Sequence, residues 1–108
     1  MADRLPDVVE AFRTQHPKVW EAYERLGAAA AEAGPLDEKT VRLCKLALAI
    51  GLGSEGAVHS HARRALRAGL SAEAVEQVAT LAVTTIGWPR FMQAHSWIRD
   101  VTSGKRPG

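Results

Sequence analysis

The side chains in this sequence whose types and spacing suggest chemistry are its histidines, above all His59 and His61. They lie two residues apart in the segment GLGSEGAVHSHARRALRAGLS, behind the glycine turn at 51–53. The ordinary pKa of histidine is close to neutral pH, so either side chain could act as a general acid or base or bind a carboxylate. The alternative is a pair of structural histidines at a helix junction.

A metal site at these histidines depends on the helix that carries them. Successive residues of an α-helix are about 100° apart, so His59 and His61 diverge by about 200° and cannot share one ion. Glu55 and His59, four residues apart, could share one face of the helix. His95 would complete a divalent site with them only if the last helix returns to this turn. We therefore predict no metal and no cofactor.

A second group of candidates surrounds the Gly-Trp-Pro corner at 87–89. We expect Trp88 to form a pocket wall and Arg90 to hold a carboxylate through its fork of N–H donors. Glu55 is the third residue that we expect to bind substrate. Aromatic and arginine side chains are also common in protein interfaces, so packing of Trp88 between subunits, with Arg90 solvated, is the alternative.

Helical segments must position these residues, because apolar side chains recur at three- and four-residue spacing and no segment alternates as a strand does. The predicted helices span residues 5–15, 17–34, 38–52, 55–68, 72–87 and 90–101. Three polar residues that directly precede helices are predicted N-caps: Asp37, Ser54 and Ser71. The sequence thus predicts an all-α bundle of five or six helices with short connections.

The helix predicted over residues 38–52 has an unusually broad apolar surface. Its main stripe is widened by Cys44 and Leu48, which predicts a position near the centre of the bundle and a buried Cys44. Gly53, at its end, is suited to the left-handed conformation of a helix C-cap.

Composition favours one soluble, cytoplasmic domain over residues 1–108. The chain is 46% hydrophobic and 24% charged, which is ordinary for a globular protein, and its net charge is +2. Lysines and arginines are scattered rather than clustered, which argues against nucleic acid as a partner. No apolar run reaches the roughly 18 residues of a membrane span, no signal peptide is evident, and the single cysteine excludes an internal disulfide.

The order of several short motifs resembles one known family. LDEKT opens the third helix, LALAIGLGSE leads into the glycine turn, HARRALRAGLSAEAVEQV begins at His61, and TTIGWP forms a glycine-proline corner. From Leu36 to about Trp97, the sequence resembles the carboxymuconolactone decarboxylase family, which includes the alkyl hydroperoxidase D-like proteins. Residues 1–34 would add N-terminal helices and residues 102–108 a tail. The resemblance implies an all-α bundle that forms homo-oligomers, usually trimers or hexamers.

The resemblance implies two chemistries, and one of them lacks its residues here. Thiol-dependent peroxide reduction uses a Cys-x-x-Cys-x-x-x-His motif and an upstream Glu. With the family's histidine at His61, the two cysteines fall on Ser54 and Ala57, and the acid falls on Arg42. Without these thiols the peroxidase mechanism is not expected. A divergent peroxidase that uses Cys44 alone is one remaining alternative.

The other chemistry is that of a lyase, the decarboxylation of a lactone carboxylic acid, again with His61 as the family's histidine. The corner that typically reads Tyr-Cys-Gly-x-Pro reads Thr-Ile-Gly-Trp-Pro here, so the resemblance does not specify the substrate. We predict a protein that acts on a small anionic organic molecule, with His61 as acid/base and His59 and His95 assisting. The rival hypothesis is a non-catalytic oligomeric scaffold that binds a small molecule, so the sequence leaves open whether the chain is an enzyme.

Overall fold

The computed structural model describes residues 6–104 of the chain. This part consists of helices and contains no strand: α1 (Asp7–Gln15), α2 (Pro17–Ala31), α3 (Glu38–Leu52), α4 (Glu55–Arg67), α5 (Ala72–Leu81), the short 3₁₀ helix η1 (Ala82–Thr84) and α6 (Trp88–Thr102). The predicted all-α class is confirmed. None of the described helices has the length and apolar character needed to cross a membrane. Leu5 of the first predicted helix and residues 105–108 of the predicted tail lie outside the described residues.

The three predicted N-caps all form, which explains why the helix starts were predictable. The side chain of Asp37 accepts a hydrogen bond from the Thr40 backbone N–H at 2.8 Å. Ser54 and Ser71 do the same for the N–H groups three residues ahead, at 3.3 Å and 3.0 Å. Each cap satisfies one backbone donor that the first helical turn leaves unpaired.

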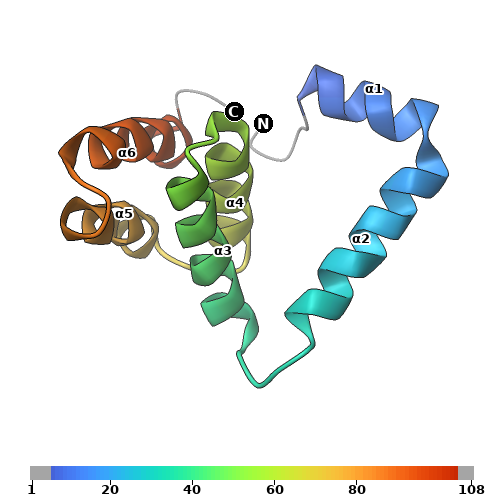
Figure 1. The fold of residues 1–108 in the computed structure, drawn as a ribbon, viewed down its shortest axis with the longest axis horizontal. Helices are drawn as coiled ribbons and strands as arrows, with labels where there is room; N and C mark the ends of the chain where they lie inside the picture. The colour runs from blue at the N-terminus through green and yellow to red at the C-terminus, as the bar shows by residue number, and fades with distance from the viewer. Residues whose placement is uncertain (1–5, 105–108) are drawn as a thin grey trace.

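The hydrophobic core of the described chain lies entirely in α3 to α6 (Figure 1). α4 packs against both α3 and α6, and α5 packs against α3, α4 and α6. Most buried apolar side chains are small, which lets the helices approach closely. They are Leu46, Ala49, Ile50, Val58, Ala62, Ala65, Val75, Ala79, Ala82, Ala94, Ile98 and Val101. We call residues 38–102 the core.

α1 and α2 form an arm, residues 7–31, that stands away from the core (Figure 1). The two helices meet at His16–Pro17 and contact each other, and neither contains a buried residue. Helices of 9 and 15 residues are marginally stable in water unless a face is packed. Large apolar side chains of the arm are nevertheless exposed: Val8, Phe12, Val19, Tyr23 and Leu26. The arm is therefore the part of the fold that depends most on further contacts.

The prediction that Cys44 is buried is wrong, because only one side of α3 is covered. Cys44 and Leu48 are exposed, Leu48 at 72%, whereas Leu46 and Ile50 are buried. Two residues along a helix correspond to about 200°, which turns Cys44 and Leu48 away from the side on which α4 and α5 bury Leu46. The broad apolar surface of α3 is thus part core and part exposed face.

Two predicted helices end early. α2 ends at Ala31, and the helix predicted over residues 72–87 ends at Leu81, where the backbone tightens into η1. The carbonyl of Ala82 accepts hydrogen bonds from the backbone N–H groups of residues 85, 86 and 87, at 3.0 Å, 2.9 Å and 3.3 Å. The β-branched residues 83–86 crowd the preceding turn and disfavour a regular α-helix. Gly87 then takes a φ of 95°, and α6 begins at Trp88 rather than at residue 90.

Candidate functional site

The turn before α4 determines which way each histidine of that helix faces. Gly53 ends α3 in the left-handed conformation, with φ 77°, and Ser54 caps α4. The angular separation of about 200° then places His59 and His61 on opposite faces. His59 is buried at 4% exposure, and His61 is partly buried. One helix therefore carries two histidines in different environments.

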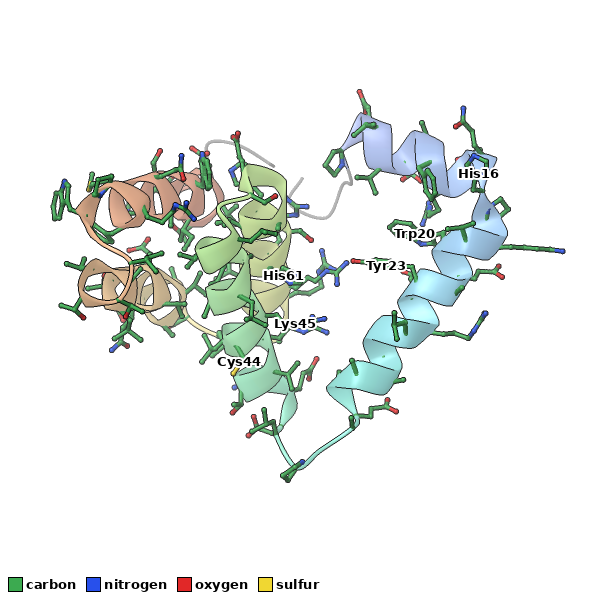
Figure 2. All side chains as sticks on the ribbon, in the orientation of Figure 1. His16, Trp20, Tyr23, Cys44, Lys45 and His61 are labelled. Carbon is green, nitrogen blue, oxygen red and sulfur yellow. The ribbon has the colours of Figure 1, made fainter. Side chains whose placement is uncertain are left out.

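His61 borders a cavity of about 390 Å³ between the arm and the core. α2 contributes the aromatic pair Trp20 and Tyr23, whose ring centroids are 5.9 Å apart. Figure 2 shows Tyr23 projecting from α2 toward the helices that carry Lys45 and His61. Arg42 and Lys45 of α3 and Arg64 of α4 complete the charged wall, and Glu24 of α2 is the acidic residue of the lining. The cavity thus has an aromatic side and a cationic side.

The electrostatics of this cavity act directly on His61. Burial, and after it the positive charges of Arg64, Lys45 and Arg42, together lower the pKa of the imidazole from 6.5 to about 4. At neutral pH the ring is therefore uncharged. Its Nδ1 atom is buried and has no hydrogen-bond partner among the described residues. A buried polar atom without a partner is costly, and a bound ligand is one way to satisfy it.

Two further cavities adjoin the His61 cavity. One, of about 340 Å³, shares Arg42, Arg64 and Glu24 with it and extends to Arg67, so the cationic wall continues along α4. The other, of about 190 Å³, lies where the end of α2 faces the start of α3 and contains Cys44. The lone thiol is therefore in a different cavity from His61.

His59 faces α6 instead of the arm. Its Nε2 lies 3.0 Å from Oδ2 of Asp100, and because a carboxylate only accepts, Nε2 carries the proton of this hydrogen bond. Glu55 lies one helical turn before His59. One carboxylate oxygen of Glu55, one of Asp100 and one ring nitrogen of His59 all lie within 4.8 Å of one another. The predicted common face of Glu55 and His59 is thus present, with Asp100 beside it.

The remaining predicted site residues lie near the start of α6. Nη1 of Arg90 donates to the carbonyl oxygen of Gly51 at 2.9 Å, so the guanidinium caps the last turn of α3. Trp88 is exposed, with its ring centroid 5.2 Å from that of Phe91. The ring of His95 also contacts Phe91, and its Nδ1 is buried without a partner among the described residues.

The structure therefore does not bring the six predicted site residues together. Of these six, only His61 lines the cavity between arm and core. The residues that join it there are ones that the sequence analysis left out of the site: Trp20, Tyr23, Arg42, Lys45 and Arg64. Helical spacing could have indicated one of them, since Arg64 follows His61 by three residues. Nothing in the sequence indicated that the arm would face α3 and α4.

Comparison with known proteins gives the family of the chain. It matches the model of the carboxymuconolactone decarboxylase family over residues 17–100. An uncharacterized protein of Methanocaldococcus jannaschii is 30% identical over 102 residues, which cover 94% of this chain and 95% of that protein. An uncharacterized protein of Haemophilus influenzae is 47% identical over 51 residues, 47% of this chain and 45% of that protein. No solved structure gives a significant match.

The family match covers both sides of the cavity. It begins at Pro17, the first residue of α2, and extends through α3, α4 and α5 to Asp100 of α6. The sequence contains a single cysteine, so it has no Cys-x-x-Cys pair. The resemblance in motif order is thereby confirmed, and the chain belongs to the carboxymuconolactone decarboxylase family.

Proposed function

We propose that the cavity between arm and core binds a small anionic organic molecule and that His61 acts on it as an acid/base in decarboxylase- or lactone-type chemistry. The observation that carries the proposal is geometric. A partly buried imidazole, with a buried Nδ1 that has no partner among the described residues, lies beside three cationic side chains in the lining of a cavity of about 390 Å³.

The cationic wall supports the choice of an anion. Arg42, Lys45 and Arg64 line the cavity with Glu24 as the opposing charge, so the lining carries a net charge of 3 − 1 = +2 with His61 neutral. Arginine binds carboxylates through paired N–H donors. The aromatic rings of Trp20 and Tyr23 offer a flat apolar surface to the body of the molecule. A small, unsaturated carboxylic acid fits both sides.

The proton chemistry follows from what decarboxylation requires. The bond to the carboxylate breaks, CO₂ leaves, and the electron pair that remains on carbon delocalises onto a neighbouring carbonyl oxygen. A cation of the wall stabilises that developing charge. The carbon then takes up one proton, which His61 relays from a water molecule, and the hydroxide that remains combines with the released CO₂ as bicarbonate.

The side chains that the family's thiol chemistry requires are absent from this sequence. Ser54 and Ala57 occupy the two cysteine positions, and the Ser54 hydroxyl accepts the N–H of Ala57 as a helix cap. Arg42 replaces the acid and lies in the cavity with His61. Arg42 and His61, which the motif spacing aligns with the family's acid and histidine, thus line the same cavity, with a cation where the thiol chemistry has a carboxylate.

Several parts of the proposal extend beyond this cavity. Assistance from His59 and His95, and substrate contacts from Arg90, Trp88 and Glu55, stay predictions, as do a cytoplasmic location and the absence of nucleic acid as a partner. We also propose a homo-oligomer, trimer or hexamer. Its support is the arm without buried residues, together with the exposed Leu48 and Leu52 of α3.

The test uses the full chain and a panel of lactone carboxylic acids, with their methyl esters as uncharged controls. We expect CO₂ release from a carboxylate and no binding of the ester. His61→Gln should lower kcat by about 10²- to 10⁴-fold, the usual contribution of a general acid or base. His16→Gln, an exposed histidine between α1 and α2, is the matched control and should leave turnover unchanged.

Two outcomes would contradict the proposal. Turnover that survives His61→Gln would exclude the acid/base role. The non-catalytic scaffold would be favoured if a carboxylate binds, if Arg64→Gln weakens that binding, and if the unaltered chain releases CO₂ from none of the acids.

A further inference from the structure

We infer that Glu55, His59 and Asp100 form a binding site for a divalent transition-metal ion, such as Zn²⁺, between α4 and α6. This site is separate from the His61 cavity, because its histidine is on the opposite face of α4 and none of its three residues lines that cavity. The inference does not depend on the role proposed for His61.

The first support is the spacing of the ligand atoms. One ligand atom from each of the three side chains lies within 4.8 Å of the other two. When a tetrahedral zinc ion is bound with metal–ligand distances of about 2.0–2.1 Å, two neighbouring ligand atoms are about 3.3 Å apart. His59 Nε2 and Asp100 Oδ2, at 3.0 Å, are already near that spacing. A rotation of the Glu55 side chain, which is exposed, can close the remaining gap.

The second support is the way in which the ligands are held. His59 is buried, with 5% of its side chain exposed, so packing fixes the direction of its ring. The Asp100 side chain, at 27% exposure, comes from a different helix that packs against α4. Two ligands are therefore prearranged in the core, and the third approaches from solvent. This leaves a position open to water, as in zinc sites with three protein ligands.

Charge favours a cation here in spite of two opposing features. The carboxylates of Glu55 and Asp100 supply two negative charges. Arg63, buried one turn beyond His59 on the same face, supplies one positive charge, and the start of α4 adds a partial positive charge. The carboxylates outweigh both, so a divalent ion lowers the electrostatic energy of the cluster.

The donor types select the ion. Imidazole together with carboxylates suits zinc and its neighbours in the transition series, whereas Mg²⁺ and Ca²⁺ prefer oxygen ligands alone. The imidazole binds in its neutral form through Nε2. The proton that Nε2 now donates to Asp100 therefore moves to Nδ1 or is released to solvent.

The sequence alone predicts no metal, and this inference departs from that prediction because the fold brings Asp100 to Glu55 and His59. Glu55 and His59 were recognised as sharing a face, with His95 as the third ligand on condition that the last helix returns to the turn. α6 does return to α4, but it brings Asp100 to the pair. The ring of His95 instead contacts Phe91.

The experiment is a titration of the tag-free, chelator-treated full chain with Zn²⁺. Calorimetry measures the stoichiometry and affinity of binding, and thermal unfolding measures the change in Tm. We expect one ion per chain and a Tm higher by roughly 10 °C at a hundredfold excess over Kd. Mg²⁺ at the same concentration should leave the Tm unchanged. Glu55→Gln, which changes an exposed side chain and leaves the core intact, should weaken binding at least tenfold, since even outer-shell partners of metal ligands contribute about 10- to 100-fold.

Asp100→Asn should also weaken binding, and His95→Gln and His16→Gln should not. The inference is overturned if no Zn²⁺ binds with defined stoichiometry. It is also overturned if Glu55→Gln and Asp100→Asn bind as tightly as the unaltered chain, or if the ion is lost in His16→Gln or His95→Gln instead.

Discussion

The two faces of α4 show how the same side chain acquires different properties within two residues. His59 lies against α6, is buried, and donates to Asp100 at 3.0 Å. His61 lies against an open cavity, and its buried Nδ1 has no partner among the described residues. Packing has satisfied one imidazole and left the other available.

The two faces of α4 have different roles: the His59 face stabilises the fold, and the His61 face is available for binding. On the His59 face, the hydrogen bond between His59 and Asp100 ties α4 to α6. On the His61 face, the neighbouring charges of Arg64, Lys45 and Arg42 lower the pKa of the imidazole after burial has already done so, and the fold gains nothing from this arrangement. Unsatisfied polar groups of this kind are typical of functional sites rather than structural ones.

The largest expected difference between the two faces is in folding stability. His59→Ala should lower the free energy of unfolding by about 2–4 kcal/mol, because it empties a packed position and leaves the partly buried carboxylate of Asp100 without its donor. His61→Ala should cost less than about 1 kcal/mol, since its Nδ1 has no partner to lose. Urea denaturation at neutral pH measures both, with a chelator present to remove any ion.

Each variant is the control for the other, because both remove an imidazole from the same helix. Equal losses of stability would contradict the distinction between a packed face and an available face. A larger loss for His61→Ala would reverse it.

The next expected effect is on the pH dependence of stability. The pKa of His61 is about 4 in the folded chain, because of burial and then the nearby cations, against 6.5 for the free side chain. As the pH falls from 6.5 toward 4, the unfolded chain takes up a proton that the folded chain does not, so stability decreases in that window. The decrease should be roughly 1–2 kcal/mol, less than the full shift implies, because the ring is only partly buried.

The contribution of His61 can be separated from those of the carboxylates. Thr102 donates to Glu76 at 2.7 Å and lowers its pKa from 4.5, while Thr40 lowers the pKa of Asp37 from 3.8. Stability from lowered carboxyl pKa values is lost only at more acidic pH. Urea titrations of His61→Gln should therefore show no slope between pH 6.5 and about 5. A slope that persists in this variant would assign it to other groups.

The sequence predicted the helices because their signals are local. Asp37, Ser54 and Ser71 cap helices through the N–H three residues ahead, and Gly53 ends α3 with a positive φ. The early end of α5 was missed, since the helical apolar period runs on through the β-branched residues 83–86 that tighten the backbone. The spacing of apolar side chains alone does not show that β-branched residues disfavour the α-helix there.

The site was less predictable because it depends on contacts between distant segments. His61 is a predicted site residue, whereas Trp20 and Tyr23 join the site only because the arm faces α3 and α4. Periodicity identifies which face of a helix is apolar, but it does not say which helix covers that face. Cys44 was placed in the core for the same reason.

The smallest expected effect is that of Cys44→Ser. Cys44 is exposed and lies in a cavity that His61 does not line, so the substitution should change stability by less than about 0.5 kcal/mol. The chain has no second cysteine to resolve an oxidised thiol, so peroxide consumption in the presence of a dithiol should be the same before and after the substitution. Loss of peroxide consumption in Cys44→Ser would support the divergent peroxidase and move the reactive group from α4 to the exposed side of α3. With consumption unchanged, His61 is left as the reactive side chain of the two, and the open face of α4 as the place to look for a substrate.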